Sequence, residues 1–148
     1  MKLVIGCDHG ALTLKNEIKK VLADFPNIET VDMGTHTTDS VDYPAIAKAV
    51  CDEVAAGRAE RGILLCGTGI GISIAANKIR GIRAALCHDV YSAKMARQHN
   101  DANILALGGR VLGPGPAGEI VRAFLTSDFE GGRHARRVDM IMQLENER

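Results

Sequence analysis

The sequence predicts an α/β protein of three layers, α/β/α, with a five-stranded parallel sheet in the middle. Short apolar runs alternate with amphipathic stretches along the whole chain, which is the pattern of strands alternating with helices. No two predicted strands are joined by a short hairpin turn, so each connection passes through a helix and the strands run parallel. This arrangement is of the Rossmann-like type.

The first half of the chain supplies two strands and two helices. We predict the strands at residues 2–7 and 28–33 and the helices at 11–24 and about 42–56. Leu14, Ile18 and Leu22 recur at helical spacing, with lysines on the opposite side. Pro44 suits the first turn of the second helix, and Gly57 suits its end.

The second half supplies three strands and four helices. A buried strand is centred on residues 63–65, and further strands are predicted at 82–87 and 104–107. The helices are predicted at 70–78, 90–98, 114–125 and 133–146. In the first of them, Ile70, Ile74 and Ala75 share one side. The last helix has a narrow apolar stripe, and we leave open whether it packs on a partner subunit or on its own domain.

Composition limits the classes of function. The 148 residues are enough for a single domain, residues 1–148, with a sizeable core. Lys and Arg together number 18, as do Asp and Glu, and aromatic residues make up 3% of the chain. This balance argues against a nucleic-acid partner, which needs a basic surface and aromatic stacking platforms. No apolar run is long enough for a membrane span, so we expect no membrane partner.

The four cysteines bear on the location of the protein and on metal binding. Because no signal segment is evident, we expect a cytoplasmic protein in which Cys7, Cys51, Cys66 and Cys87 are reduced thiols. No CxxC pair is present, which argues against a structural zinc site. A metal held by the strand-end cysteines with two histidines, His9 and His88, is the weaker alternative, and we predict no metal.

Residues 61–78 contain the strongest local signal, because a buried strand, a glycine loop and a helix start follow one another. Gly67, Gly69 and Gly71 leave backbone amides uncovered and able to face a ligand. Cys66 ends the strand, where open α/β sheets bind ligands. A free cysteine at a strand end is usually a small buried apolar residue. The neighbouring helix start favours a thiolate, so we predict a reactive role for Cys66 alone.

Other polar residues gather at the carboxyl ends of the predicted strands. Asp8 and His9 follow the first strand, Thr68 follows the third, and His88 and Asp89 follow the fourth. In a parallel sheet these loops share one edge. The spacing therefore predicts a polar site at that edge.

Four basic residues have two interpretations each. Arg133 and Arg137 lie one helical turn apart and could bind a phosphate together, or could form a solvated basic face. Arg110, after two glycines, has the same ambiguity. His99 lies at a predicted helix end, where a histidine more often bonds the backbone than catalyses.

Several motifs, spread over essentially the whole chain, together match one family. They are Gly6-Cys7-Asp8-His9, Asp42-Tyr43-Pro44, the run from Cys66 to Ser73, Ala75-Ala76-Asn77-Lys78, the run from Arg97 to Asn103, and Glu130-Gly131-Gly132-Arg133-His134. On these motifs the sequence resembles ribose-5-phosphate isomerases of type B, in a group that includes galactose-6-phosphate and allose-6-phosphate isomerases. The resemblance implies a homodimer or dimer of dimers with shared active sites.

The resemblance also implies a role for each site residue. It implies that Cys66 is the catalytic base, that His99 protonates the ring oxygen of the substrate, and that Asp8 assists proton movement. It implies that Thr68 and the loop amides stabilise an enediolate. The implied substrate-binding residues are Asp8, His9, Gly67, Thr68, Gly69, Ile70, Gly71, Asn100, Arg110, Arg133 and Arg137, with His9 and the last two at the phosphate. One branch of the family has a glutamate on this loop as the base in place of the cysteine. Because residue 73 is a serine and Cys66 is present, the resemblance implies that this chain follows the cysteine branch.

The implied reaction is the reversible isomerisation of D-ribose 5-phosphate and D-ribulose 5-phosphate, without a cofactor, in the non-oxidative pentose phosphate pathway. An allose-6-phosphate or galactose-6-phosphate isomerase of the same family is the first alternative. A phosphate-ligand binding module without catalysis is the second. A thiol redox enzyme is a third, but no resolving cysteine is evident.

Overall fold

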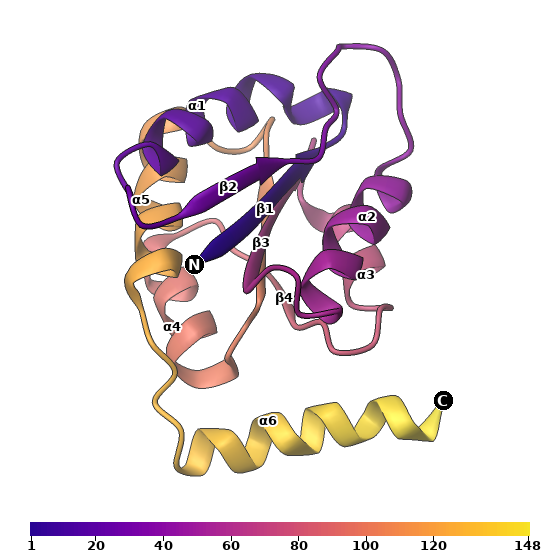
Figure 1. Cartoon of the computed structure of the whole chain (residues 1–148), viewed down its shortest axis with the longest axis vertical. Helices are drawn as coiled ribbons and strands as arrows, with labels where there is room; N and C mark the ends of the chain where they lie inside the picture. The colour runs from indigo at the N-terminus through magenta and orange to yellow at the C-terminus, as the bar shows by residue number, and fades with distance from the viewer.

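A five-stranded parallel sheet in the order β2-β1-β3-β5-β4 forms the middle layer of the computed structural model, which describes all 148 residues (Figure 1). The strands are β1 (Lys2–Cys7), β2 (Glu29–Asp32), β3 (Arg61–Cys66), β4 (Ala84–Leu86) and β5 (Ile104–Gly108). All four strand pairings are parallel, with Ile63 of β3 opposite both Ile5 of β1 and Leu105 of β5. The predicted fold class is confirmed.

Six α-helices cover the sheet and its lower end (Figure 1). They are α1 (Leu12–Leu22), α2 (Tyr43–Ala55), α3 (Ile70–Ala76), α4 (Val90–Asn100), α5 (Pro114–Thr126) and α6 (Arg133–Gln143); short 3-10 turns, η1 (His9–Ala11) and η2 (Leu144–Glu147), precede α1 and follow α6. None of these helices has the length and apolar character needed to cross a lipid bilayer.

The two helical layers enclose separate apolar cores on the two faces of the sheet. Alternate residues of a strand point to opposite faces, so Ile63 packs with α1, α4 and α5, whereas Leu64 packs with α2 and α3. Phe124 of α5 is fully buried in the larger core. Because both faces of the central strands are covered, these strands are continuous apolar runs.

The structure corrects the predicted bounds of two elements. The fourth strand covers Ala84–Leu86 rather than residues 82–87, and α3 ends at Ala76 rather than at residue 78. The cause is a tight connection in which the side chain of Asn77 accepts a hydrogen bond from the Ala84 amide (2.8 Å) and donates one to the Ala84 carbonyl (2.9 Å).

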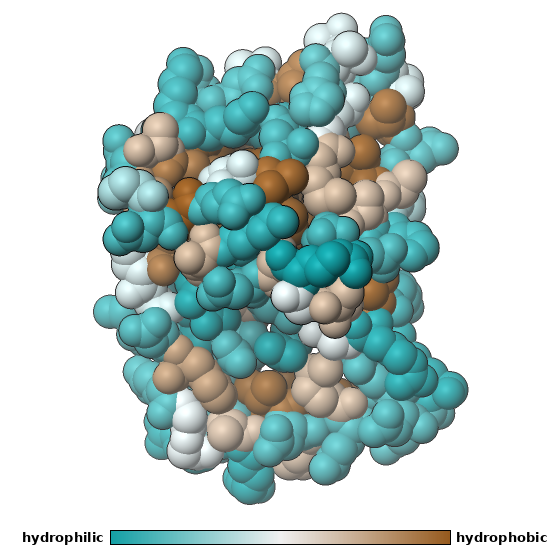
Figure 2. Space-filling model, viewed as in Figure 1, coloured by the Kyte–Doolittle hydropathy of each residue, from teal (hydrophilic) through white to brown (hydrophobic).

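The apolar side predicted for α3 faces outward. Ile70 is 50% exposed and Ile74 is 56% exposed, whereas Ile72 and Ala76 are buried against the sheet. Ile70 and Ile74, one helical turn apart, together form a small exposed apolar patch on α3. The face seen in Figure 2 is largely hydrophilic, with small apolar patches between polar side chains.

A buried ion pair fixes the loop that follows β2. Lys15 of α1 is fully buried, and its Nζ donates to Asp32 Oδ1 (2.7 Å) and to the carbonyl of Thr35 (2.6 Å). Lys19 donates to the other carboxylate oxygen of Asp32 (2.8 Å). Burial alone would raise the pKa of Asp32, but these bonds and the Gly34 amide outweigh it and lower the pKa to about 2.

Helix α6 lies beyond the amino ends of the strands, apart from the two layers (Figure 1). It contacts α4, and Val138 is its buried apolar residue. Glu145 in η2 accepts a hydrogen bond from the Gly81 amide (3.0 Å), which holds the end of the chain against the connection before β4. Met140 and Ile141 are exposed, and Ile141 lines a groove between α6 and the connection to β4.

Candidate active site

Cys66 ends β3 with its sulfur in contact with the following glycine loop. The residue is 5% exposed, and its Sγ accepts a hydrogen bond from the Gly69 amide at 3.1 Å. The next helix, α3, has only seven residues, so its dipole is small. The direct hydrogen bond from the Gly69 amide is therefore the main interaction that stabilises negative charge on the sulfur. The amides of Gly67 and Thr68 make no hydrogen bond within the protein. They are donors that a ligand above Cys66 can use.

Only glycine fits at the centre of this loop. Gly69 has φ +76°, and a Cβ there would lie 2.6 Å from Leu86 Cδ1 and 2.8 Å from the carbonyl carbon of Leu107. The loop can therefore close onto β5 only without a side chain. The carbonyl of Gly67 accepts from the Arg110 amide (2.9 Å), which adds a second attachment to the segment after β5.

Tyr43 at the start of α2 packs against the same loop. A Cβ on Gly71 would lie 2.6 Å from the Cζ atom of Tyr43, so the ring and the loop backbone are in direct contact. Tyr43 is 38% exposed. Tyr43 belongs to the Asp42-Tyr43-Pro44 motif but was not among the predicted site residues. An aromatic residue beside a proline at a helix start was the only local signal.

Asp8 and His9 lie at the same edge of the sheet, after β1. The Asp8 amide donates to the Leu65 carbonyl (3.1 Å), and its buried carboxylate accepts from the Gly10 amide (2.9 Å). His9 Nδ1 accepts from the Val41 amide (3.2 Å). With Nδ1 as an acceptor, the proton of the neutral ring lies on Nε2, where it can be donated to an anion. Asp8, His9 and residues 40–45 line one open cleft.

Arg110 joins the loops after β1 and β3. A Cβ on Gly67 would lie 3.1 Å from its Nη1, and a Cβ on Gly10 would lie 3.4 Å from its Nη2. The guanidinium thus lies alongside both glycine segments. The structure therefore brings Asp8, His9, Arg110 and the loop from Cys66 to Gly71 to one edge of the sheet.

The remaining predicted site residues lie at the opposite end of the sheet, near the amino ends of the strands. Helix α4 begins after the carboxyl end of β4 and runs antiparallel to the strands, so His99 and Asn100 lie where β5 begins. Eleven helical residues cover about 16 Å. Arg133 and Arg137 are exposed on α6, which packs on α4. A single protomer does not bring His99, Asn100, Arg133 or Arg137 to Cys66.

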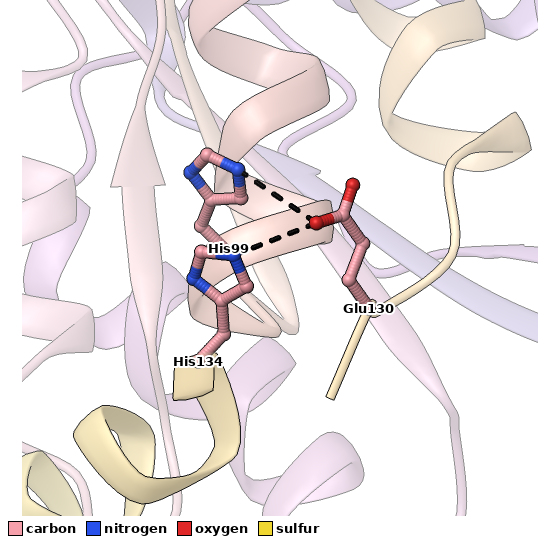
Figure 3. A group of neighbouring side chains, drawn as sticks. All are labelled: His99, Glu130 and His134. Atoms are coloured by element: carbon pink, nitrogen blue, oxygen red, sulfur yellow. Dashed lines mark ion pairs between the residues drawn. The ribbon is translucent and has the colours of Figure 1, made fainter. Parts of the chain in front are cut away.

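His99 belongs to a cluster with His134 and Glu130, which were not among the predicted site residues (Figure 3). Its ring stacks on that of His134, with centroids 4.1 Å apart and planes 8° apart. Glu130 Oε2 lies 4.0 Å from His99 Nε2 and 3.4 Å from His134 Nε2. The cluster is also the one group of three side chains in the molecule with the spacing of metal ligands. The strand-end cysteines, His9 and His88 do not form such a group.

The other three cysteines are inert by their surroundings. Burial raises the pKa of Cys7 to about 11, of Cys51 to about 12 and of Cys87 to about 11. Each is at most 2% exposed. A thiolate is the nucleophilic and basic form of cysteine, so these three residues are unreactive at neutral pH.

A second groove lies between α6 and the connection to β4. It is lined by Arg83, Asn100, Met142 and Glu145 among others. The groove contains no residue of the glycine loop, so it is separate from the edge that holds Cys66.

Comparisons with known proteins match the chain over nearly its full length. The model of the ribose/galactose isomerase family matches residues 3–141. Ribose-5-phosphate isomerase B of Escherichia coli is 49% identical over 99% of this chain and 98% of that protein. The structure of Clostridium thermocellum ribose-5-phosphate isomerase B superposes with a TM-score of 0.96 at 52% identity, covering 99% of both chains. D-erythrulose-4-phosphate isomerase of Pectobacterium atrosepticum is 44% identical over 99% of this chain and 97% of that protein.

Proposed function

The chain belongs to the ribose/galactose isomerase family, and on that basis we propose that it interconverts D-ribose 5-phosphate and D-ribulose 5-phosphate. The observation that carries this proposal is the Cys66 loop, in which a sulfur at a strand end accepts an amide hydrogen bond beside two unused backbone donors. Two ribose-5-phosphate isomerases B are 49% and 52% identical to this chain over nearly its full length, which supports ribose 5-phosphate as its substrate.

The reaction moves one proton and leaves the carbon skeleton intact. A base removes the proton from C2 of the open aldose, the hydroxyl proton shifts between O1 and O2, and the base returns a proton to C1. We assign the base to Cys66, because its sulfur lies beside donors that favour the thiolate. The charge that develops on the enediolate oxygen would be met by the amides of Gly67 and Thr68 and by the Thr68 hydroxyl.

Phosphate binding and ring opening would involve residues from both edges of the sheet. His9 offers an Nε2 proton, and Arg110 lies between the two loops at the Cys66 edge. Arg133 and Arg137 carry two further guanidinium groups on α6, a side-chain type that pairs with phosphate oxygens. His99 supplies the acid for the ring oxygen, and Asp8, which is buried and whose amide donates to Leu65 beside Cys66, assists proton transfer between hydroxyls.

A second copy of the chain would complete each site. His99 and Cys66 lie at opposite ends of one protomer, so His99 has to come from a partner whose sheet is turned around. A two-fold axis gives two equal sites, because each protomer contributes its His99 to the site that contains the Cys66 of the other. The exposed Ile70 and Ile74 beside the glycine loop provide an apolar surface for that contact.

A further association is suggested by α6. Met140 and Ile141 form a separate exposed apolar surface there, which suits packing on a partner subunit and a dimer of dimers. We also propose a cytoplasmic location for a single domain spanning residues 1–148, in keeping with its four free thiols.

The test is conversion of ribose 5-phosphate to ribulose 5-phosphate by the native chain and by Cys66→Ala, side by side in the presence of a chelator. We expect activity in the native protein and loss of at least about 1,000-fold in the folded variant. Activity in both proteins would remove Cys66 as the base. No activity in either would contradict the proposed substrate.

The second candidate function is isomerisation of a sugar phosphate of another length. The D-erythrulose-4-phosphate isomerase of Pectobacterium atrosepticum, 44% identical, favours a test with that shorter ketose phosphate. Allose 6-phosphate and galactose 6-phosphate belong in the same assay. The substrate with the highest kcat/KM identifies the preferred one.

A further inference from the structure

Glu130 and His134 lie against His99, although the proposed reaction gives neither a role (Figure 3). We propose that these two residues position His99 as the acid: the His134 ring fixes the plane of the His99 imidazole, and Glu130 balances the charge of its protonated form. Both act through His99, so they are positioning residues. The inference rests on the proposed function, in which His99 opens the sugar ring.

The two stacked rings differ in their surroundings. His134 is 7% exposed, whereas the side chain of His99 is 37% exposed. Burial lowers the pKa of His134, and the positive charges of His99, Arg133 and Arg137 lower it further, while Glu130 acts in the opposite direction. Two protonated rings at a centroid distance of 4.1 Å would repel one another. His134, whose pKa is lowered, is therefore the ring that stays neutral, and His99 is the more exposed ring of the pair, open to a substrate.

Glu130 is held beside His99 by its own backbone. Its amide donates a hydrogen bond of 3.0 Å to the carbonyl of Gln98, the residue before His99. Gly131 and Gly132 have φ +65° and +56°, so the chain turns sharply before α6 begins. This turn brings the carboxylate and the His134 ring to the same imidazole from two sides.

The two ring nitrogens of His99 have different surroundings. Its Nε2 points toward the carboxylate, and the other ring nitrogen points away from it (Figure 3). A carboxylate on one nitrogen of a histidine commonly sets the orientation of the other nitrogen. The second nitrogen is thus the one left to donate to substrate.

A bound metal ion is the competing interpretation of the same three side chains. The donor atoms lie within 4.8 Å of one another, as ligands of one ion do. However, a metal ion lies in the ring plane of each ligating histidine, and nearly parallel stacked rings cannot both contain one ion in their planes. The adjacent guanidinium of Arg133 also disfavours a cation. The arrangement fits a positioned proton donor better than a metal ligand set.

The experiment separates ring opening from carbon-proton chemistry. Ribulose 5-phosphate is an open chain, because its O5 carries the phosphate and cannot close a five-membered ring. Uptake of deuterium from D2O at its C1 therefore needs the base and the enediolate donors but no ring-opening acid. Net conversion of ribose 5-phosphate needs all of them. Both rates are measured for the native protein, Glu130→Gln, His134→Ala and His134→Phe.

We expect Glu130→Gln and His134→Ala to lower net conversion by about 10-fold or more. Deuterium uptake should stay within about two-fold of native, since the Cys66 half of the site is untouched. His134→Phe keeps a flat ring under His99 and should lose less than His134→Ala. Glu119→Gln, an exposed acid on α5, is the matched control and should change neither rate.

Two results would overturn the inference. Native conversion in both Glu130→Gln and His134→Ala would show that His99 needs neither residue, and a parallel fall in conversion and deuterium uptake would show a general structural role. If the native protein itself lacks both rates, the proposed function fails and the acid role of His99 fails with it. Unchanged rates after chelator treatment are expected, and loss of net conversion on chelation would favour the metal interpretation.

Discussion

The Gly69 amide donates a 3.1 Å hydrogen bond to the sulfur of Cys66. Gly69 can reach this position because its left-handed backbone lets the loop close against β5 without a side chain. The bond gives Cys66 a polar partner that favours negative charge on sulfur. Burial raises the pKa of Cys7 and Cys87 to about 11 and that of Cys51 to about 12.

Iodoacetamide should therefore modify Cys66 first. At neutral pH the buried Cys7, Cys51 and Cys87 carry almost no thiolate, and thiolate is the form that reacts. Peptide mapping by mass spectrometry after one equivalent of reagent should find the label on Cys66, with loss of isomerase activity. Bound substrate should slow the labelling. Fast labelling of any other cysteine in the folded protein would contradict this expectation, and Cys66→Ser serves as the control.

Gly69→Ala should damage both the loop and the activity. The new Cβ would clash with Leu86 and with the backbone of Leu107, so the amide would leave the sulfur. We expect at least about a 100-fold loss of kcat, the scale of losing an anion-stabilising donor.

Gly57→Ala is the control that has the backbone strain of an alanine at positive φ but not the steric clash of Gly69→Ala. Gly57 also has a positive φ (+72°), but no atom lies within 4 Å of a Cβ built there. It should cost about 1 kcal/mol of unfolding free energy and leave activity intact. Chemical denaturation and steady-state kinetics measure both effects. Equal activity in the two variants would show that the loop tolerates a shift at Gly69.

Mixing two inactive variants should restore activity if sites are shared between protomers. Cys66→Ala lacks the base and His99→Asn lacks the acid, but a mixed dimer has one site with both residues intact. After unfolding and refolding an equimolar mixture, random pairing should restore about a quarter of native activity. Each variant refolded alone is the control. A mixture as inactive as its components would place Cys66 and His99 in the same protomer and contradict the shared site.

Asp32 should make the protein sensitive to acid. Its pKa is lowered to about 2 in the folded state, below the value of about 4 for an unfolded chain. The stabilisation is therefore complete above pH 4 and is lost as the pH falls from about 4 to about 2, a change of about 2 kcal/mol. Urea unfolding across this range measures the loss.

Asp32→Asn should remove that pH dependence and cost about 3 kcal/mol at pH 7, because it leaves the buried Lys15 without its carboxylate. Asp52→Asn breaks an exposed pair with Lys48 and should cost less than about 1 kcal/mol. Equal costs for the two variants would show that burial of Lys15 adds nothing to its ion pair.

The layers and strand direction could be predicted because they depend on patterns local in sequence. Short apolar runs that alternate with segments of helical spacing predicted five parallel strands, and the spacing of the glycines predicted the loop after Cys66. The length of β4 was wrong because the Asn77–Ala84 contact is a side-chain bond that periodicity does not encode. Spacing also places Ile70 and Ile74 on one side without saying whether that side meets the core or a partner.

The arrangement of the site needed the three-dimensional structure. That His99 and Cys66 lie at opposite edges follows from the antiparallel run of α4, which the order of elements already contains. The contact of Glu130 and His134 with His99 does not follow from sequence, since it depends on the turn at Gly131 and Gly132. The individual roles of the site residues stay predictions until the variants are measured.

The pairing of Asn77 with Ala84 has a consequence for self-association. β4 is an edge strand of three residues, and exposed strand edges invite another chain to add itself and start aggregates. The Asn77 amide binds both the N–H and the C=O of Ala84, the first residue of that edge. The β4 edge of the sheet is thus short and partly occupied by the protein's own side chain. We therefore expect little association between copies of this chain by strand addition at β4.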